Sequence, residues 1–440
     1  MITQTQQKNF DLYRETVKSQ TEGRARLTKL FDDGQFSEFE TFTSKNVLSA
    51  TGFVRGFGVA AFSQDRSTSS QMNAAHADKI CRTFDTAAKL GVPVVGFYDC
   101  DGALISEGAE SVLNYGKILA KSASYSGVIP QIAVVDGVCS GTLAVIAASA
   151  DFIIATAKSE IYTSPKSEKN SLTEIASVIV SDIDEAIEKV SKILEILPGN
   201  NINAVPEFEY ITSGTQPGET AEKTALAFCD GDSVIELFPD YGNASYIALA
   251  QIGGSAVGYV ATDKTAGKIV TKDCKKIARF VNFCDAFGLP IITLINSEGF
   301  CPNVSVRAMA KLTSSYSQAT APKINIFSGL AYGSLAAAFC ASNADTVIAF
   351  PDAVIAPMLP DTAVEFLYHE KLRDIADPAA KRNELADTYK DENGALAAAE
   401  KGLVSEIIAP GDLRSALINI LDILRSKRVF GLPGKKHSAV

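Results

Sequence analysis

Two stretches of the chain, FDTAAKLGVPVVGFYD at residues 84–99 and VNFCDAFGLPIITLIN at residues 281–296, follow the same pattern. Each begins with the periodicity of an amphipathic helix and then runs through Gly-x-Pro into a nearly continuous apolar segment. Such segments are typical of strands that helices cover on both faces. Gly91 in the first stretch corresponds to Gly288 in the second, 197 residues later. The two stretches therefore predict two copies of a layered α/β unit.

The correspondence extends beyond these stretches and indicates an internal duplication. Residues 74–165 and 271–357 both contain, in order, an amphipathic helix, an apolar strand, a glycine-bearing loop, a second helix, a strand and a small-residue turn. Gly141 corresponds to Gly333 at a separation of 192 residues, so the second copy has a shorter loop and helix in between. A period of about 190 residues is that of a duplicated domain and not of a solenoid.

A hairpin is expected before each copy. Alternating segments at Gly52–Gln64, around Arg55-Gly56, and at Tyr246–Thr262, around Gly253-Gly254, have the pattern of two strands joined by a tight turn. Each copy of the unit therefore starts with two strands and a helix.

The ends of the two copies set the expected domain boundaries. Residues 197–220 are rich in Pro, Gly, Asn and Thr, which is typical of a surface linker. We therefore expect one domain at residues 1–200 and a second at residues 201–440. Residues 395–428 have helical periodicity and predict a docking helix, after which comes the basic tail 432–440.

Composition restricts the class of protein. The chain has 440 residues, of which 46% are hydrophobic and 21% charged, with a net charge of −10, so we expect a folded protein that does not bind nucleic acid. Its eight cysteines contain no C-x-x-C pair, which argues against a zinc site and against a disulfide framework. The polar N-terminus predicts a cytoplasmic protein. The uncharged run 324–344 predicts a buried strand, turn and helix and not a membrane insertion.

Two strand-turn-helix junctions are candidates for chemistry. VVDGVCSGTLAVIAAS at residues 134–149 and IFSGLAYGSLAAAF at residues 326–339 occupy equivalent positions and are rich in small residues. The first N–H groups of a helix have no partner within it, so such a junction can hold an oxyanion. Small residues at this place also allow tight packing of strand against helix, and the pattern leaves both interpretations open.

Side chains that commonly act as catalysts are scarce. The sequence contains three histidines, no G-x-S-x-G, no H-E-x-x-H and no Walker A motif, and we expect no metal site. We expect His76 and His369 to lie on helix surfaces or at caps, and Cys139 to be a buried structural residue. The carboxylates around the first glycine loop are expected to be solvated: Asp99, Asp101, Glu107 and Glu110.

Several ordered segments together resemble the biotin-dependent acyl-CoA carboxyltransferase family, the carboxyltransferase subunits of propionyl-CoA and acetyl-CoA carboxylases and of methylmalonyl-CoA and glutaconyl-CoA decarboxylases. They include RARLTKLFDDGQFSEFE, SGVIPQIAVVDGVCSG, ELFPDYGNASYIALAQIGGSAVGYVATD and SQATAPKINIFSGLAYGS. The resemblance implies two tandem crotonase-like (ClpP/crotonase) domains, the first for the acyl-CoA and the second for carboxybiotin. It also implies a homo-oligomer, with a hexamer favoured, and active sites formed between subunits.

The resemblance also implies partners and a mechanism. Biotin is carried by a separate biotin carboxyl carrier protein, which works with biotin carboxylase or decarboxylase subunits. Two backbone oxyanion pockets hold the thioester enolate and the ureido oxygen of biotin. The first pocket falls on Gly141 and Thr142, and the second on Gly333, Ser334 and Leu335. Further substrate contacts fall on Gly102, Ala103, Ser140, Gly299 and Phe300.

Three positions differ from the pattern of that family. Thr142 and Ser334 stand where the family has the second glycine of a Gly-Gly pair, and Leu104 replaces an arginine. An alternative interpretation is therefore a diverged, non-catalytic paralogue that acts as a scaffold in a biotin-dependent carboxylase or decarboxylase complex.

Overall fold

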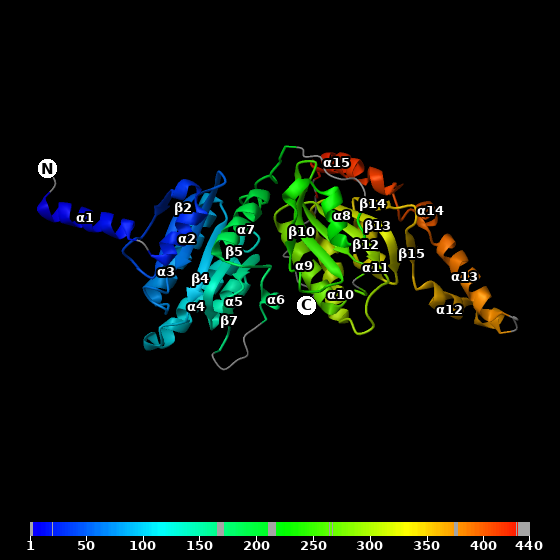
Figure 1. Ribbon diagram of the computed structural model, residues 1–440, viewed down its shortest axis with the longest axis horizontal. Helices are drawn as coiled ribbons and strands as arrows, with labels where there is room; N and C mark the ends of the chain where they lie inside the picture. Colours follow the sequence, from blue (N-terminus) through cyan, green and yellow to red (C-terminus); the bar gives the residue numbers. More distant parts are fainter. Residues whose placement is uncertain are drawn as a thin grey trace. The chain divides into compact units, whose positions relative to one another are not determined.

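The computed structural model describes residues 3–19, 21–164, 171–209, 217–263, 265, 267–373, 377–427 and 429. The chain divides into two compact units, unit 1 at Met1–Asn203 and unit 2 at Ala204–Val440 (Figure 1). Each unit contains an eight-stranded sheet with helices packed against it.

The sheet of unit 1 has the order β1-β2-β3-β4-β5-β6-β8, and β7 pairs with β5. Strands β1 to β3 are antiparallel, whereas β3 to β6 and β8 are parallel. The strands are β1 Phe36–Glu38, β2 Val47–Val54, β3 Phe57–Gln64, β4 Val94–Cys100, β5 Gln131–Ser140, β6 Phe152–Thr156, β7 Glu160–Tyr162 and β8 Val178–Val180. The helices are α1 Gln4–Lys18, α2 Glu22–Leu30, α3 Ala74–Leu90, α4 Ala109–Tyr125, α5 Thr142–Ala148, α6 Leu172–Ile175 and α7 Ile183–Ile196.

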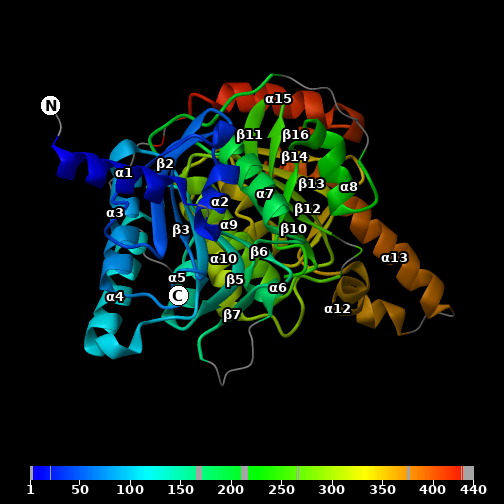
Figure 2. The same ribbon diagram turned by 60° about the vertical axis from the view of Figure 1, so that its left-hand side comes forward.

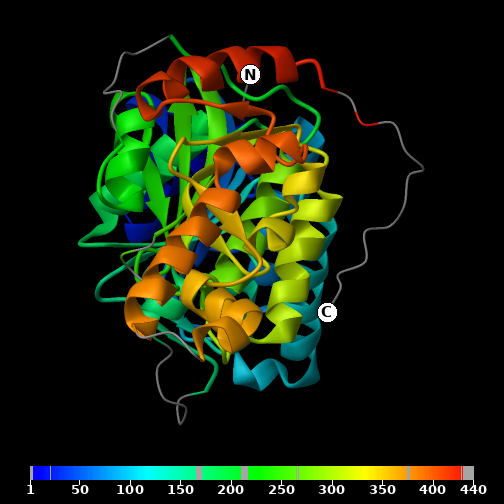
Figure 3. The ribbon, with the colours of Figure 1, turned by 90° about the vertical axis from the view of Figure 1, so that its right-hand side faces the viewer.

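Unit 2 repeats this topology with the order β9-β10-β11-β12-β13-β14-β16, and β15 pairs with β13. Its strands are β9 Ile235–Leu237, β10 Ser245–Ile252, β11 Ser255–Thr262, β12 Ile291–Ser297, β13 Lys323–Tyr332, β14 Thr346–Ala349, β15 Val354–Ala356 and β16 Glu406–Ile407. Its helices are α8 Ala221–Phe228, α9 Thr271–Ala286, α10 Val306–Gln318, α11 Leu335–Ala338, α12 Pro360–Leu372, α13 Pro378–Glu392, α14 Ala395–Glu400 and α15 Leu413–Leu424. Helices α12 and α13 pack on each other beside β15, and α15 lies over the sheet (Figure 3).

One hydrophobic core cluster of unit 1 lies between the sheet and the helices α3 and α4, which run side by side (Figure 2). Helix α3 begins after Asn73, whose side chain accepts a hydrogen bond from the His76 N–H, and it ends at Gly91 with φ of 67°. A positive φ favours glycine at this helix end. The apolar face of α3, with Ile80 and Phe84, then packs on the continuous apolar strands β3 to β5.

The structure confirms both predicted hairpins, β2–β3 and β10–β11, and the strand, turn and helix predicted for residues 324–344. No helix of the described residues is long and apolar enough to cross a membrane. The predicted helix over residues 395–428 is wrong in extent, because β16 interrupts it. Helix α15 does dock on the core of unit 2 through its leucines. Residues 210–216 of the expected linker and the basic tail lie outside the described residues.

Two predictions about side chains in unit 1 are wrong. His76 is 1% exposed, because its ring faces the sheet and lies 3.1 Å from the Gln64 amide nitrogen, whereas Asn73 caps the helix. Asp99 is 5% exposed, because it is part of strand β4 and pairs with Arg26. His369 is exposed on α12, as predicted.

Candidate functional site

A bulge shapes the end of β5, where the first candidate junction lies. Tyr98 of β4 pairs with Val135, but Cys100 pairs with Cys139, so β5 contains two more residues than β4 over this span. A bulge of this kind bends the strand and changes the direction of the chain beyond it. After the bulge the chain turns at Gly141, with φ of 64°, directly into α5.

The equivalent strand of unit 2 has the same bulge. Ile295 of β12 pairs with Phe327, and Ser297 pairs with Ala331. The next turn is at Gly333, with φ of 69°, and α11 begins two residues later. The duplication has therefore kept the backbone of the junction in both units.

The hydrogen bonds at these turns distinguish the candidate donors. The Gly141 N–H donates to the Tyr162 carbonyl at 2.9 Å, and the Gly333 N–H donates to the Ala356 carbonyl at 2.9 Å. The next N–H groups, at Thr142 and Ser334, have no partner among the described residues. The N–H groups of Thr142 and Ser334 can therefore donate to a ligand, whereas those of Gly141 and Gly333 are already bonded to carbonyls.

A second loop lies beside the first junction. Gly102 has φ of 114°, and its carbonyl accepts a hydrogen bond from the Met72 N–H at 2.8 Å. The Ser140 hydroxyl donates to the Asp101 carbonyl at 2.5 Å, which ties this loop to the end of β5. A Cβ at Gly102 would lie 3.3 Å from the Ser140 Oγ. The structure therefore brings Gly102, Ser140 and their neighbours Ala103, Gly141 and Thr142 together.

The corresponding loop of unit 2 lies beside the second junction. Gly299 has φ of 118°, and a Cβ there would lie 3.4 Å from the Tyr332 carbonyl oxygen. Phe300 forms an isolated parallel bridge with Ile269. Gly299 and Phe300 therefore lie next to the turn at Gly333 and to its neighbours Ser334 and Leu335.

The cysteines and the buried histidine of unit 1 are poor nucleophiles and bases in this environment. Burial raises the pKa of the Cys100 thiol to about 11 and also raises that of Cys139, which is fully buried as predicted. Burial, with a smaller contribution from the charge of Lys79, lowers the pKa of His76 to about 3. The thiols are therefore protonated and the imidazole is neutral at pH 7. Backbone N–H groups are the hydrogen-bond donors that the junction offers to an anionic ligand.

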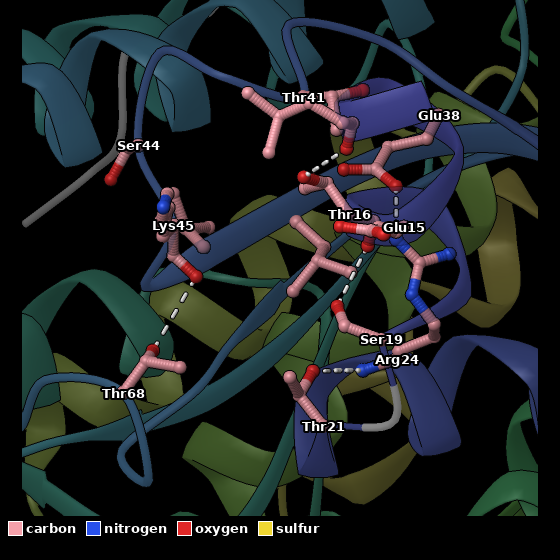
Figure 4. Close-up of a pocket in the computed structure, with 13 residues that line it drawn as sticks. Glu15, Thr16, Ser19, Thr21, Arg24, Glu38, Thr41, Ser44, Lys45 and Thr68 are labelled. Atoms are coloured by element: carbon pink, nitrogen blue, oxygen red, sulfur yellow. Dashed lines mark hydrogen bonds and ion pairs between the residues drawn. The ribbon is translucent and has the colours of Figure 1, made fainter. Parts of the chain in front are cut away.

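A cavity of about 320 Å³ lies elsewhere in unit 1, among α1, α2, β1 and β2 (Figure 4). An ion pair between Arg24 and Glu38 forms part of its wall, and both side chains are almost fully buried. None of the thirteen residues that line this cavity is a site residue expected from the sequence. Sequence analysis missed it because its lining residues, six of which are serines or threonines, are scattered along the chain and form no motif.

Comparison with known proteins identifies the family. The carboxyl transferase domain model matches residues 23–178 and 171–440. The chain is 31% identical to the methylmalonyl-CoA decarboxylase subunit alpha of Propionigenium modestum, over 95% of this chain and 92% of that protein. It is 32% identical to the putative propionyl-CoA carboxylase beta chain of Bacillus subtilis (strain 168), over 98% of this chain and 95% of that protein.

A solved structure agrees with these matches. The transcarboxylase 12S hexamer, with methylmalonyl-CoA and methylmalonic acid bound, matches with a TM-score of 0.87 and 28% identity, over 97% of this chain and 93% of that chain. The match confirms the tandem crotonase-like fold that the sequence resemblance implied. With a family model that covers nearly the whole chain and relatives above 30% identity, the protein belongs to the carboxyl transferase family.

Proposed function

We propose that this protein is the carboxyltransferase component of a biotin-dependent acyl-CoA carboxylase or decarboxylase, with the acyl-CoA bound by unit 1 and carboxybiotin by unit 2. One observation carries the proposal. In unit 1 the Thr142 N–H, which has no partner within the described part of the chain, lies beside the Gly102–Ala103 loop, and unit 2 repeats this arrangement at Ser334 beside Gly299–Phe300. Two equivalent donor sites suit a reaction in which two substrates each develop an anionic oxygen.

In unit 1, the Thr142 and Ala103 N–H groups are assigned to the thioester enolate oxygen. Gly141 provides the turn, and its own N–H remains bound to the Tyr162 carbonyl. In unit 2, the Ser334 and Leu335 N–H groups are assigned to the ureido oxygen of biotin. Bound carboxybiotin would supply the carboxyl group and, once that group has left, a base for the α-proton. The contribution of the chain is to hold both reactants and stabilise their charge.

The partners proposed are a separate biotinylated carrier protein and a biotin carboxylase or a decarboxylase subunit. We also propose a homo-oligomer, with a hexamer favoured, in which sites form between subunits. Light scattering of the active protein tests this. A monomer at micromolar concentration with full carboxyl-transfer activity would contradict shared sites.

Carboxyl transfer between free biotin and a panel of short-chain acyl-CoA and carboxyacyl-CoA thioesters tests the activity. We expect turnover that requires both biotin and the thioester. A second candidate, the non-catalytic scaffold, is favoured by the side chains of Thr142 and Ser334 and by Leu104. A folded protein that binds its complex but neither binds nor carboxylates any thioester of the panel would support the scaffold instead.

A further inference from the structure

A buried carboxylate fills the bulge of β5 beside the proposed enolate pocket. Asp99, at the end of β4, accepts a hydrogen bond from the Val138 N–H at 3.4 Å. Its Oδ1 lies so close to Gly137 that a Cβ there would be 2.4 Å away. The Asp99 side chain therefore occupies the space that the extra residues of β5 open. Thr142 follows four residues after Val138, the residue whose N–H Asp99 accepts from.

The charge of this carboxylate is compensated inside unit 1. The Arg26 Nη2 lies 3.0 Å from the Asp99 Oδ2 and 3.7 Å from the Asp136 Oδ2. The Arg26 Nη1 donates to the Gln64 carbonyl at 2.9 Å, and the Gln64 Oε1 accepts from the Asp99 N–H at 3.0 Å. Arg26 is 7% exposed, so the pair is sheltered from water and its geometry is fixed by hydrogen bonds.

Unit 2 builds the same bulge without charge. Asn296 corresponds to Asp99, and its Oδ1 accepts from the Leu330 N–H at 3.1 Å. A Cβ at Gly329 would lie 2.5 Å from this Oδ1. Thr224 lies four residues before the end of α8, as Arg26 lies four residues before the end of α2. The Thr224 hydroxyl donates to the Gly218 and Thr220 carbonyls. Ser328 stands where unit 1 has Asp136.

We infer that Asp99 is a positioning residue for the enolate pocket and that Arg26 is the cation that allows a carboxylate to fill this role. The inference rests on the proposed function, because it acts through Thr142. The side-chain oxygen holds the bulge, and the bulge sets where the Thr142 N–H points. Without Arg26, the negative charge of Asp99 would lie next to a pocket that must stabilise an enolate. The cost of burying the Asp99 carboxylate would also no longer be offset by an ion pair with Arg26.

Four variants test this inference: Asp99→Ala, Asp99→Asn, Arg26→Thr, and Arg26→Thr with Asp99→Asn, which copies the neutral pair of unit 2. We expect kcat to fall on the order of 10²-fold for Asp99→Ala with KM nearly unchanged, because a shift of about 1 Å in a donor has this effect. Arg26→Thr alone should lose at least about tenfold in kcat, and adding Asp99→Asn should restore most of it. Asp78→Asn, an exposed carboxylate on α3, is the matched control.

Amide hydrogen exchange of the peptide 136–142 in the intact protein gives a readout that needs no substrate. It should speed up in Asp99→Ala and Arg26→Thr and return toward wild type in the double variant. The inference is overturned if the double variant is no better than Arg26→Thr, or if Asp99→Ala lowers the melting temperature but keeps wild-type kcat and exchange. A slow Thr142→Pro variant beside fully active Asp99 variants would reject this inference alone. An active Thr142→Pro variant would reject the pocket itself.

Discussion

The two hairpin turns of the duplicated units use the same device in different surroundings. In unit 1, the Asp32 carboxylate accepts hydrogen bonds from the Arg55 and Gly56 N–H groups, both at 2.8 Å. In unit 2, the Asp230 carboxylate accepts from Gly253 and Gly254 at 2.9 and 2.7 Å. All four turn residues have positive φ, as the tight turn between two twisted strands requires.

The cations near these carboxylates differ. Asp32 is exposed, and Arg55 turns away from it to pair with Glu188 and Glu195 of α7. Asp230 is fully buried and pairs with Arg414 of α15 at 2.5 Å. The two units therefore share a backbone arrangement whose carboxylate is exposed in unit 1 and buried in unit 2, and we expect the two turns to contribute differently to stability.

The largest effect is expected for Arg414→Met, which keeps volume but leaves Asp230 buried without its cation. Breaking a buried pair from one side destabilises a protein by about 3–5 kcal/mol. Urea unfolding followed by circular dichroism measures the loss, and adding Asp230→Asn should recover a large part of it. A loss below about 1 kcal/mol would show that the pair is no more important than one at the surface.

The next effect concerns the donor of the proposed enolate pocket. Thr142→Pro removes an N–H that has no partner among the described residues, at the first position of α5, where proline is tolerated. We expect turnover to fall on the order of 10² to 10³-fold, as when one oxyanion donor is lost, with little change in melting temperature. Thr142→Gly keeps the donor and should be as fast as wild type or faster. A folded proline variant with wild-type turnover would place the enolate oxygen elsewhere.

How far the sequence predicts this molecule depends on the range of the interactions. Glycines, turns and apolar runs act locally, so the hairpins, the duplicated strands and the two junctions could be placed from the sequence. The partner of Asp99 is Arg26, 73 residues away, and nothing near Asp99 in the sequence indicates that it is buried. Gly141 and Thr142 differ because the Gly141 N–H is bonded to Tyr162, at the end of a three-residue strand, whereas the Thr142 N–H has no partner among the residues that the structure describes. No local sequence pattern indicates this contact with Tyr162.

A third effect separates helix α3 from its duplicate α9. His76 is buried and neutral in α3, whereas Asp273 stands at the same position of α9. Because the folded pKa of His76 is about 3 and the unfolded value 6.5, the unfolded chain binds an extra proton at acidic pH, and stability falls as the pH drops below 6.5. The slope is about 1.4 kcal/mol per pH unit, or roughly 2 kcal/mol between pH 6.5 and 4.5.

Hydrogen exchange of peptides from the two helices, corrected for intrinsic rates, measures this difference within one sample. Protection of α3 should weaken at pH 4.5 more than that of α9, and His76→Gln should remove the excess. An equal pH response in wild type and His76→Gln would contradict the assignment.

At alkaline pH the pH-sensitive residue lies in α9 instead of α3. Burial, partly offset by Asp273 and Glu236, lowers the pKa of Lys276 in α9 to about 8, so stability of unit 2 should rise between pH 8 and 10.5.

The smallest effect is expected at the exposed turn of unit 1. The Arg55 side chain is 36% exposed, and dissolved salt screens its ion pairs with Glu188 and Glu195. Arg55→Ala should therefore cost less than about 1 kcal/mol, and less again in high salt. Arg55→Gly loses the same ion pairs but removes the backbone strain of a non-glycine residue at φ of 49°; unit 2 already has a glycine, Gly253, at this turn position. The free energy of unfolding of Arg55→Gly should therefore equal or exceed that of Arg55→Ala. If Arg55→Ala instead destabilises the protein as much as Arg414→Met does, the two turns carry equal weight and burial of the Asp230 pair is not what distinguishes them.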